Sequence, residues 1–236
     1  GKITTKMLEG NKQAVYLQVY NWPLDTILRL TGILSKPEKA ELITGAGRRS
    51  LPFTQNGPLT HLQLPGAAGD PFVSTIVLEY AQPVKLDEEV VAESTFGGFA
   101  LSSENVWDNT PQYQLVRYDG LRPTHLVMDK AGTITWEFYA PEPGDYTVDL
   151  SGHNSSKEDV AITVSTIDQQ LQHSIKPTGK VVVEPHDSYT DEFVDHRLGS
   201  FHFSKAGFYQ VTLKLNSAAG QQLLFNRLWI DRAAAH

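Results

Sequence analysis

The residues best suited to chemistry are aromatic side chains in a polar, turn-like part of the chain. Trp107 lies in the stretch 102–111, with Asp108 and Asn109 directly after it. A tryptophan or tyrosine ring stacks on the C–H groups of a sugar, and neighbouring amides and carboxylates hydrogen-bond its hydroxyls. These patterns predict a carbohydrate-binding site formed by the following residues: Trp107, Asp108, Asn109, Tyr113, Tyr118 and Tyr189. Trp136 and Trp229 lie inside apparent strands and are expected to pack in a core instead.

Signals of catalysis are weak in this sequence. A glycosidase needs two facing carboxylates about 5–10 Å apart, whereas the acidic residues here fall mostly in turns or on the solvent side of strands. No Gly-x-Ser-x-Gly nucleophile elbow occurs. The segment His186–His196 holds two histidines and four acidic residues, but its spacing fits neither an EF-hand nor His-Glu-x-x-His. We interpret it as a polar loop and expect no enzymatic activity from the chain.

Composition narrows the function classes further. The 236 residues include 20 basic and 27 acidic ones, a net charge of −7 that opposes nucleic-acid binding. The absence of cysteine excludes disulfides, thiolate metal sites and a cysteine nucleophile. No apolar run approaches the roughly 20 residues that span a bilayer, so we expect no membrane partner. With 40% hydrophobic residues the chain can form a substantial core.

Short apolar or alternating runs, each closed by Gly, Pro, Asn or Asp, predict strands along nearly the whole chain. The clearest runs are 15–20, 26–30, 40–43, 75–80, 133–139, 146–150, 160–164, 198–203, 209–215, 222–225 and 228–230. The best helical candidate is only Val84–Ala92. We therefore predict an all-β chain made of two consecutive antiparallel β-sandwich domains, divided near Gln82-Pro83. The predicted domains are 1–82 and 83–232, and 233–236 is expected to be an added tail, with Gly1 a cleavage remnant.

The run from Tyr16 to Gly32, with Asn21-Trp22-Pro23 at its centre, resembles the start of the C-terminal β-sandwich that follows the catalytic barrel of bacterial α-L-fucosidases. The stretches 42–45, 64–65 and 75–79 extend this similarity over about residues 3–80. The resemblance implies a non-catalytic accessory region of a glycoside hydrolase, because the catalytic Asp and Glu of the family belong to the barrel. It also implies a periplasmic or extracellular location, and the catalytic domain of the parent chain as a partner. Pro23 ends the strand, so we expect the Trp22 indole at its edge, free to pack against a neighbouring domain.

The second domain is similar, more loosely, to galactose-binding-like jelly rolls such as carbohydrate-binding modules. The similarity rests on residues 132–138, 140–148, 204–213 and 228–231. It implies a structural Ca²⁺ held by Glu93 and Asp231, and no other cofactor. The long insertion Gln172–His196 departs from these modules, so their sugar-binding residues do not transfer.

Two functions remain open at this point. The second domain could bind a glycan weakly and hold a tethered catalytic domain near its substrate. Alternatively, both domains could be structural, supporting the barrel or mediating self-association without any glycan. Exposure of the large aromatic side chains distinguishes the two, because a structural role predicts that they are buried or gather around Trp22.

Overall fold

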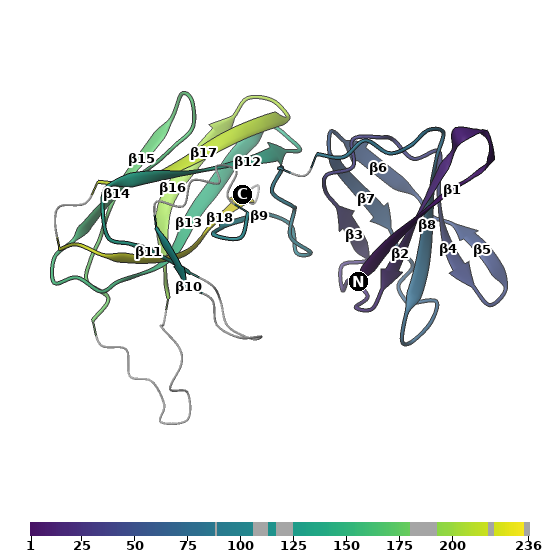
Figure 1. The fold of residues 1–236 in the computed structure, drawn as a ribbon, viewed down its shortest axis with the longest axis horizontal. Coiled ribbons are helices and arrows are strands. Elements are labelled where there is room, and N and C mark those ends of the chain that lie inside the picture. Colours follow the sequence, from purple (N-terminus) through teal and green to yellow (C-terminus); the bar gives the residue numbers. More distant parts are fainter. Residues whose placement is uncertain (88, 106–112, 117–124, 180–192, 217–219, 234–236) are drawn as a thin grey trace. The chain divides into compact units, whose positions relative to one another are not determined.

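The computed structural model describes residues 1–87, 89–105, 113–116, 125–179, 193–216 and 220–233. Within these residues the chain forms eighteen β-strands and one short 3-10 helix, η1 (Glu9–Asn11). Every ladder between named strands is antiparallel, which confirms the all-β prediction (Figure 1). No helix in the described part of the chain is long and apolar enough to cross a membrane.

The chain divides into two compact units, and the boundary between them lies further along the sequence than residue 82. The first unit comprises Gly1–Glu88 and Ala92–Gly97, and the second comprises Glu89–Val91 and Gly98–His236. Residues 84–87 stay with the first unit because their backbone bonds to it: Leu34 N–H donates to Lys85 O at 2.9 Å. The described residues of Val84–Ala92, the best helical candidate in the sequence, form no helix: Leu86 forms a bridge with Ile33 and Val90 forms one with Glu137. These bridges give the backbone hydrogen-bond partners without a helix.

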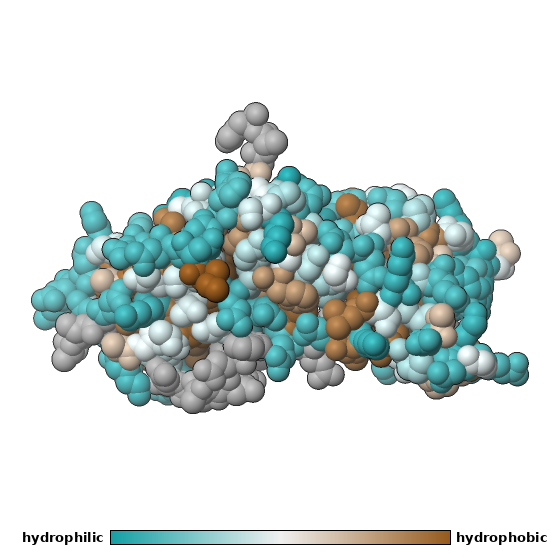
Figure 2. Space-filling model, turned by 90° about the horizontal axis from the view of Figure 1, so that it is seen from above, coloured by the Kyte–Doolittle hydropathy of each residue, from teal (hydrophilic) through white to brown (hydrophobic). Residues whose placement is uncertain are grey.

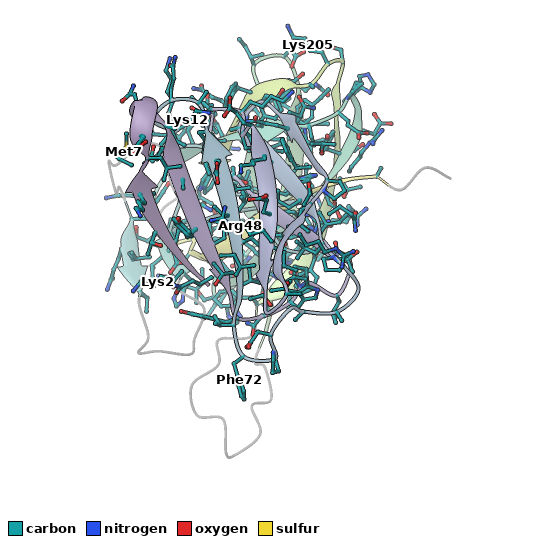
Figure 3. The ribbon with its side chains drawn as sticks, turned by 90° about the vertical axis from the view of Figure 1, so that its right-hand side faces the viewer. Lys2, Met7, Lys12, Arg48, Phe72 and Lys205 are labelled. Atoms are coloured by element: carbon teal, nitrogen blue, oxygen red, sulfur yellow. The ribbon has the colours of Figure 1, made fainter. Side chains whose placement is uncertain are left out.

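The first unit is built from two antiparallel sheets around an aliphatic core. The five-stranded sheet has the order β1 (Lys2–Met7), β2 (Gln13–Val19), β8 (Ser74–Tyr80), β4 (Lys39–Thr44) and β5 (Gly47–Ser50). The three-stranded sheet has the order β3 (Ile27–Leu30), β7 (Leu59–Gln63) and β6 (Phe53–Asn56). Alternate residues such as Leu17, Leu62 and Ile76 form the core, as period-2 patterning requires. Figure 3 looks onto the five-stranded sheet, where Arg48 bridges Glu41 and Glu79 across three strands.

Trp22 does not present a free indole, contrary to the sequence-based expectation. Its ring packs against the core of the first unit, and its Nε1–H donates to the Pro65 carbonyl at 2.9 Å. A partly buried indole N–H needs an acceptor, and the segment that follows β7 supplies one. Trp22 therefore packs and hydrogen-bonds within its own unit.

The second unit is also built from two antiparallel sheets. One contains β10 (Gln114–Val116), β11 (His125–Met128), β18 (Leu223–Arg232), β13 (Gly144–Asn154) and β16 (Val194–Phe203), with β9 (Phe99–Ser102) also paired to β18. The other has the order β12 (Gly132–Ala140), β17 (Gly207–Leu215), β14 (Val160–Ser165) and β15 (Gln170–Ile175). Figure 1 shows these two layers. Whether their connections form a jelly roll stays a prediction.

Aromatic rings join the two sheets of the second unit. Phe99 and Phe138 have ring centroids 4.8 Å apart, and Phe203 and Tyr209 are 3.9 Å apart. Trp136 is fully buried and lies 5.6 Å from Phe225, which confirms its predicted core role. Its Nε1–H donates to the Ser102 carbonyl at 2.7 Å, so the buried indole N–H keeps a hydrogen bond.

Two histidine rings lie close together where β15 lies beside β16. The rings of His173 and His196 have centroids 6.4 Å apart, and His196 Nε2 is buried with no hydrogen-bond partner. Burial lowers the pKa of His196, the nearby His173 lowers it further, and the Asp195 carboxylate acts in the opposite direction. The unfolded chain therefore binds a proton at this residue more readily than the folded chain does.

We predict that the second unit loses stability as the pH falls below the ordinary histidine pKa of 6.5. The contribution is fully present above that value and is lost as the pH falls from there through the lowered folded-state pKa. Denaturant unfolding between about pH 7.5 and about pH 5 measures the effect. His196→Phe should flatten the pH dependence. A parent protein with equal stability at both ends of this range would contradict the prediction.

Candidate functional site

The strongest candidate site lies on the outer face of the larger sheet in the second unit. On β18 the side chains of Leu228 and Ile230 are completely buried. Because successive strand residues point to opposite faces, Trp229 and Arg227 project from the other side of the sheet. Trp229 is half-buried and Arg227 is exposed. The strand thus has an apolar inner row and an outer row that combines an aromatic ring with a guanidinium.

Strand register places these side chains in two parallel rows. In the first row Trp229 is paired with Ala100 of β9 on one side and with Asp149 of β13 on the other. Asp149 is in turn paired with Arg197 of β16. Directly paired residues on one face lie within contact distance of each other.

The second row lies two residues along the strands. Ser151 of β13 is paired with Arg227 of β18 and with Asp195 of β16. The two rows together bring residues from four strands, far apart in the sequence, onto one patch of the sheet.

Two β-bulges are needed to bring these residues to the same face. The register of β13 with β16 shifts between Val148 and Asp149, leaving Leu198 as the extra residue. The register of β13 with β18 shifts between Ser151 and Gly152, leaving Asn226 as the extra residue. Each extra residue reverses which alternate positions face outward. Without the bulge at Leu198, the strand that buries Phe201 would also point Arg197 and Asp195 inward.

The outer patch is hollowed because its centre carries small residues. A hollow of about 530 Å³ is lined by Ala100, Asp149, Ser151, Asp195, Arg197, Arg227 and Trp229. Ala100 and Ser151 are short, while longer side chains from the flanking strands stand around them. The volume lies within the range of about 300–1,000 Å³ typical of small-molecule sites. An aromatic ring, two guanidiniums and two carboxylates therefore converge on one cavity.

The orientation of Trp229 is set by close contact with Gly98. A Cβ atom added to Gly98 would lie 2.7 Å from Trp229 Cζ2, and the residue has a φ of +69°. Both the contact and the left-handed backbone favour glycine. On the other side of the ring, Arg197 Nε–H donates to Asp149 Oδ1, and this carboxylate raises the pKa of Arg197. The site is thus held in shape before any ligand binds.

Of the six sugar-binding residues predicted from the sequence, only Tyr113 lies within the described residues. Trp107, Asp108, Asn109, Tyr118 and Tyr189 lie outside the described residues. Tyr113 is described, and its predicted role needs correction because only 6% of its surface is exposed. Its hydroxyl donates to the Lys130 carbonyl at 3.1 Å, and burial raises its pKa to about 12. A ring enclosed in this way has no free face for a sugar.

The predicted calcium ligands belong to different units. In the first unit Glu93 is paired with Arg29, with 3.4 Å between Arg29 Nε and Glu93 Oε1, and its other oxygen contacts His61 Nε2. Asp231 lies on β18 in the second unit, where its carbonyl accepts a bond from Thr147 Oγ1 at 3.2 Å. Within the described ranges, no group of three or more His, Asp or Glu side chains could hold a metal ion. The Ca²⁺ site stays a prediction, and the structure gives the Glu93 carboxylate two protein partners.

The lining residues were missed because Trp229 was expected in the core. One signal was present in the sequence: Trp229 lies between two apolar residues, Leu228 and Ile230, so period-2 alternation places it on the opposite face. Asp149 shows the same pattern between Val148 and Leu150, both completely buried. Arg197 and Asp195 reach the same face only because of the bulge at Leu198, and this bulge leaves no clear signal in the sequence.

Comparisons with known proteins give similar structures but no family assignment. No family model and no curated protein matches the chain. Similar solved structures include the α-L-fucosidase from Vibrio sp. strain EJY3, with 18% identity and a TM-score of 0.49 over 96% of this chain and 39% of that chain. The isomalto-dextranase of Arthrobacter globiformis T6, complexed with panose, has 11% identity and a TM-score of 0.43 over 97% of this chain and 36% of that chain.

A structure with a different activity is similar to the same degree. The mosquito-larvicidal Cry4Aa toxin from Bacillus thuringiensis has 6% identity and a TM-score of 0.48 over 88% of this chain and 43% of that chain. The chain therefore spans less than half the length of each of these proteins. Glycoside hydrolases are among the similar structures, but at these identities and TM-scores the likeness does not extend to function.

We predict that Gly98→Ala disturbs the candidate site and lowers stability by roughly 1–3 kcal/mol. The added methyl group must displace either the Trp229 ring or the Ile230 carbonyl, which lies 3.1 Å from the Cβ position. Gly220→Ala is the matched control, because Gly220 also has a left-handed φ, of +89°, but no atom lies within 4 Å of its Cβ position. Denaturant unfolding, followed by tryptophan fluorescence, measures both variants. Equal stability of the two variants would contradict the packing described for Gly98.

Proposed function

We propose that the chain is a non-catalytic accessory region of an α-L-fucosidase-like glycoside hydrolase and that its second unit binds carbohydrate weakly. The observation that supports binding is the hollow around Trp229, where a half-exposed indole lies beside two arginines and two aspartates. Aromatic faces stack on sugar C–H groups, while charged side chains hydrogen-bond sugar hydroxyls. The accessory role rests on the resemblance of residues 3–80 to the region after the fucosidase barrel. That role makes the catalytic domain of the parent chain its partner, and places the protein in the periplasm or outside the cell.

An open hollow on a sheet face gives weak binding, since few ligand atoms lose contact with water. Weak binding is sufficient for an accessory region. A tethered module raises the effective concentration of its catalytic domain at the substrate without needing high affinity of its own.

Asp149, one of the two carboxylates of the hollow, does not suit acid–base catalysis. A glycosidase needs one carboxyl group that stays protonated to act as a general acid. Asp149 instead accepts a charge-assisted hydrogen bond from Arg197, so this carboxylate already has a protein partner. The site is therefore better suited to binding a sugar than to cleaving one.

A structural role is the second candidate, and exposed apolar side chains of the first unit favour it. Leu24 is 96% exposed and Phe72 is 84% exposed, while Ile3 and Met7 on β1 are 59% and 52% exposed. Figure 3 shows Phe72 projecting at the tip of a loop and Met7 at the end of β1. On the face shown in Figure 2, hydrophobic residues form separate patches within a mainly hydrophilic surface. Such residues could support a neighbouring domain, but no described contact identifies one.

We predict that Trp229→Ala lowers glycan affinity at least about tenfold, because the stacking platform is removed. Its melting temperature should change little, since the ring is only half-buried. The measurement is retention on immobilised glycans, followed by titration with those retained. Trp22→Phe is the control, because Trp22 lies in the first unit.

Trp107→Ala tests the sequence-based site separately. Loss of binding on Trp107→Ala with full binding by Trp229→Ala would place the site in the segment around Trp107. A folded parent protein that binds no glycan but self-associates would favour the structural role.

A further inference from the structure

We propose that the ligand of the Trp229 hollow is an uncharged glycan, held at two adjacent subsites. One ring stacks on Trp229, and hydroxyls of the same or the next ring bridge Arg227 and Asp195 above Ser151. This inference rests on the proposed function and specifies the chemical class of the ligand.

The second subsite is defined by two oppositely charged side chains that form no ion pair with each other. Arg227 and Asp195 flank Ser151 in one cross-strand row. Strands are spaced about 4.8 Å apart, so the two backbones are about 10 Å apart. Ser151 has a short side chain and lines the hollow together with both charged residues.

Neither charge is neutralised by a partner in the described part of the chain. The hydrogen bond described for the Arg227 side chain runs from NH1 to Asn226 Oδ1, at 3.3 Å. No ion pair is formed by Arg227 or by Asp195 within the same described residues. In the neighbouring row, by contrast, Arg197 and Asp149 neutralise each other. The guanidinium and the carboxylate of the second row are therefore available to a ligand.

The donor and acceptor capacities of these groups select the ligand class. A guanidinium only donates hydrogen bonds, and an ionised carboxylate only accepts them. A group that lies between them must accept on the Arg227 side and donate on the Asp195 side. Neighbouring sugar hydroxyls do both, because each hydroxyl is a donor and an acceptor.

Charged ligands fit less well. Among the described residues that line the hollow, two arginines and two aspartates have formal charges that cancel. A uronate or sulfate group attracted by Arg227 would also meet the Asp195 and Asp149 carboxylates. The net charge of −7 on the whole chain gives no long-range attraction for a polyanion. An uncharged polyol is not repelled by the two carboxylates and needs no long-range electrostatic attraction.

The test compares two uncharged polysaccharides, galactomannan and xyloglucan, with polygalacturonate and a sulfated galactan, using the full chain in affinity electrophoresis and calorimetry. We expect binding of an uncharged polymer that is insensitive to salt between about 0.05 M and about 0.5 M sodium chloride. Binding restricted to the acidic polymers, and lost at high salt, would overturn the uncharged-ligand inference while leaving the proposed carbohydrate function intact. Failure of a folded protein to bind any of the four polymers would contradict both.

Paired substitutions test the second subsite. Arg227→Ala and Asp195→Ala should each weaken binding about tenfold, because one hydrogen-bonding group is removed. Arg227→Gln and Asp195→Asn keep a donor or an acceptor without the charge, and should stay within about threefold of the parent. If the amide variants lose as much affinity as the alanine variants, charge rather than hydrogen bonding determines recognition, and the inference is wrong. Equal affinity of all four variants and the parent would also overturn it.

Discussion

The pairing of β13 with both β16 and β18 is the interaction on which the second unit depends. β13 pairs with β16 from Gly144 to Gly152 and with β18 from Tyr146 to Asn154. The same ladders determine the inner face, where Val148 and Leu150 are completely buried, and the outer face, where Asp149 lies beside Trp229. Because side-chain direction follows register, the core and the candidate site cannot vary independently of each other.

Small residues and bulges turn this regular sheet face into a site. A flat sheet with long side chains at every outer position would offer no cavity, whereas Ala100 and Ser151 leave space between longer neighbours. Gly98 then allows the backbone to lie against Trp229. In the first unit a polar cluster serves the fold instead: Arg29 is largely buried, forms an ion pair with Glu93 and donates a hydrogen bond to the Thr95 carbonyl. This cluster fixes residues 92–97 on the unit to which they belong.

Period-2 alternation and turn residues were sufficient to predict the all-β class and many of the strands, because both depend on local sequence. Strand β18 is not fully determined by local sequence. Its sequence predicts two runs, 222–225 and 228–230, whereas the structure has one strand, Leu223–Arg232, with a bulge at Asn226 that reverses the alternation. Trp136 was placed correctly in the core, and Trp229 was not, although its apolar neighbours on both sides already indicated an outward position.

Other features depend on contacts between segments that are distant in the sequence. The acceptor for Trp22 comes from Pro65, and the partner of the Tyr113 hydroxyl comes from Lys130. Neither contact follows from local patterning, so both side chains were expected to be more available than they are. Glu93 likewise matches a calcium-ligand position by sequence, yet its carboxylate contacts Arg29 and His61 from two other strands.

The central claim is that ligand contacts the sheet face at Trp229, and the indole N–H resonances of the four tryptophans test it directly. Each tryptophan gives one such signal in a nitrogen–proton correlation spectrum of the labelled chain, and single Trp→Phe variants assign them. During titration with a glycan that the protein retains, we expect the Trp229 signal to shift progressively while those of Trp22 and Trp136 stay in place. A titration in which the Trp107 signal shifts and the Trp229 signal does not would contradict it.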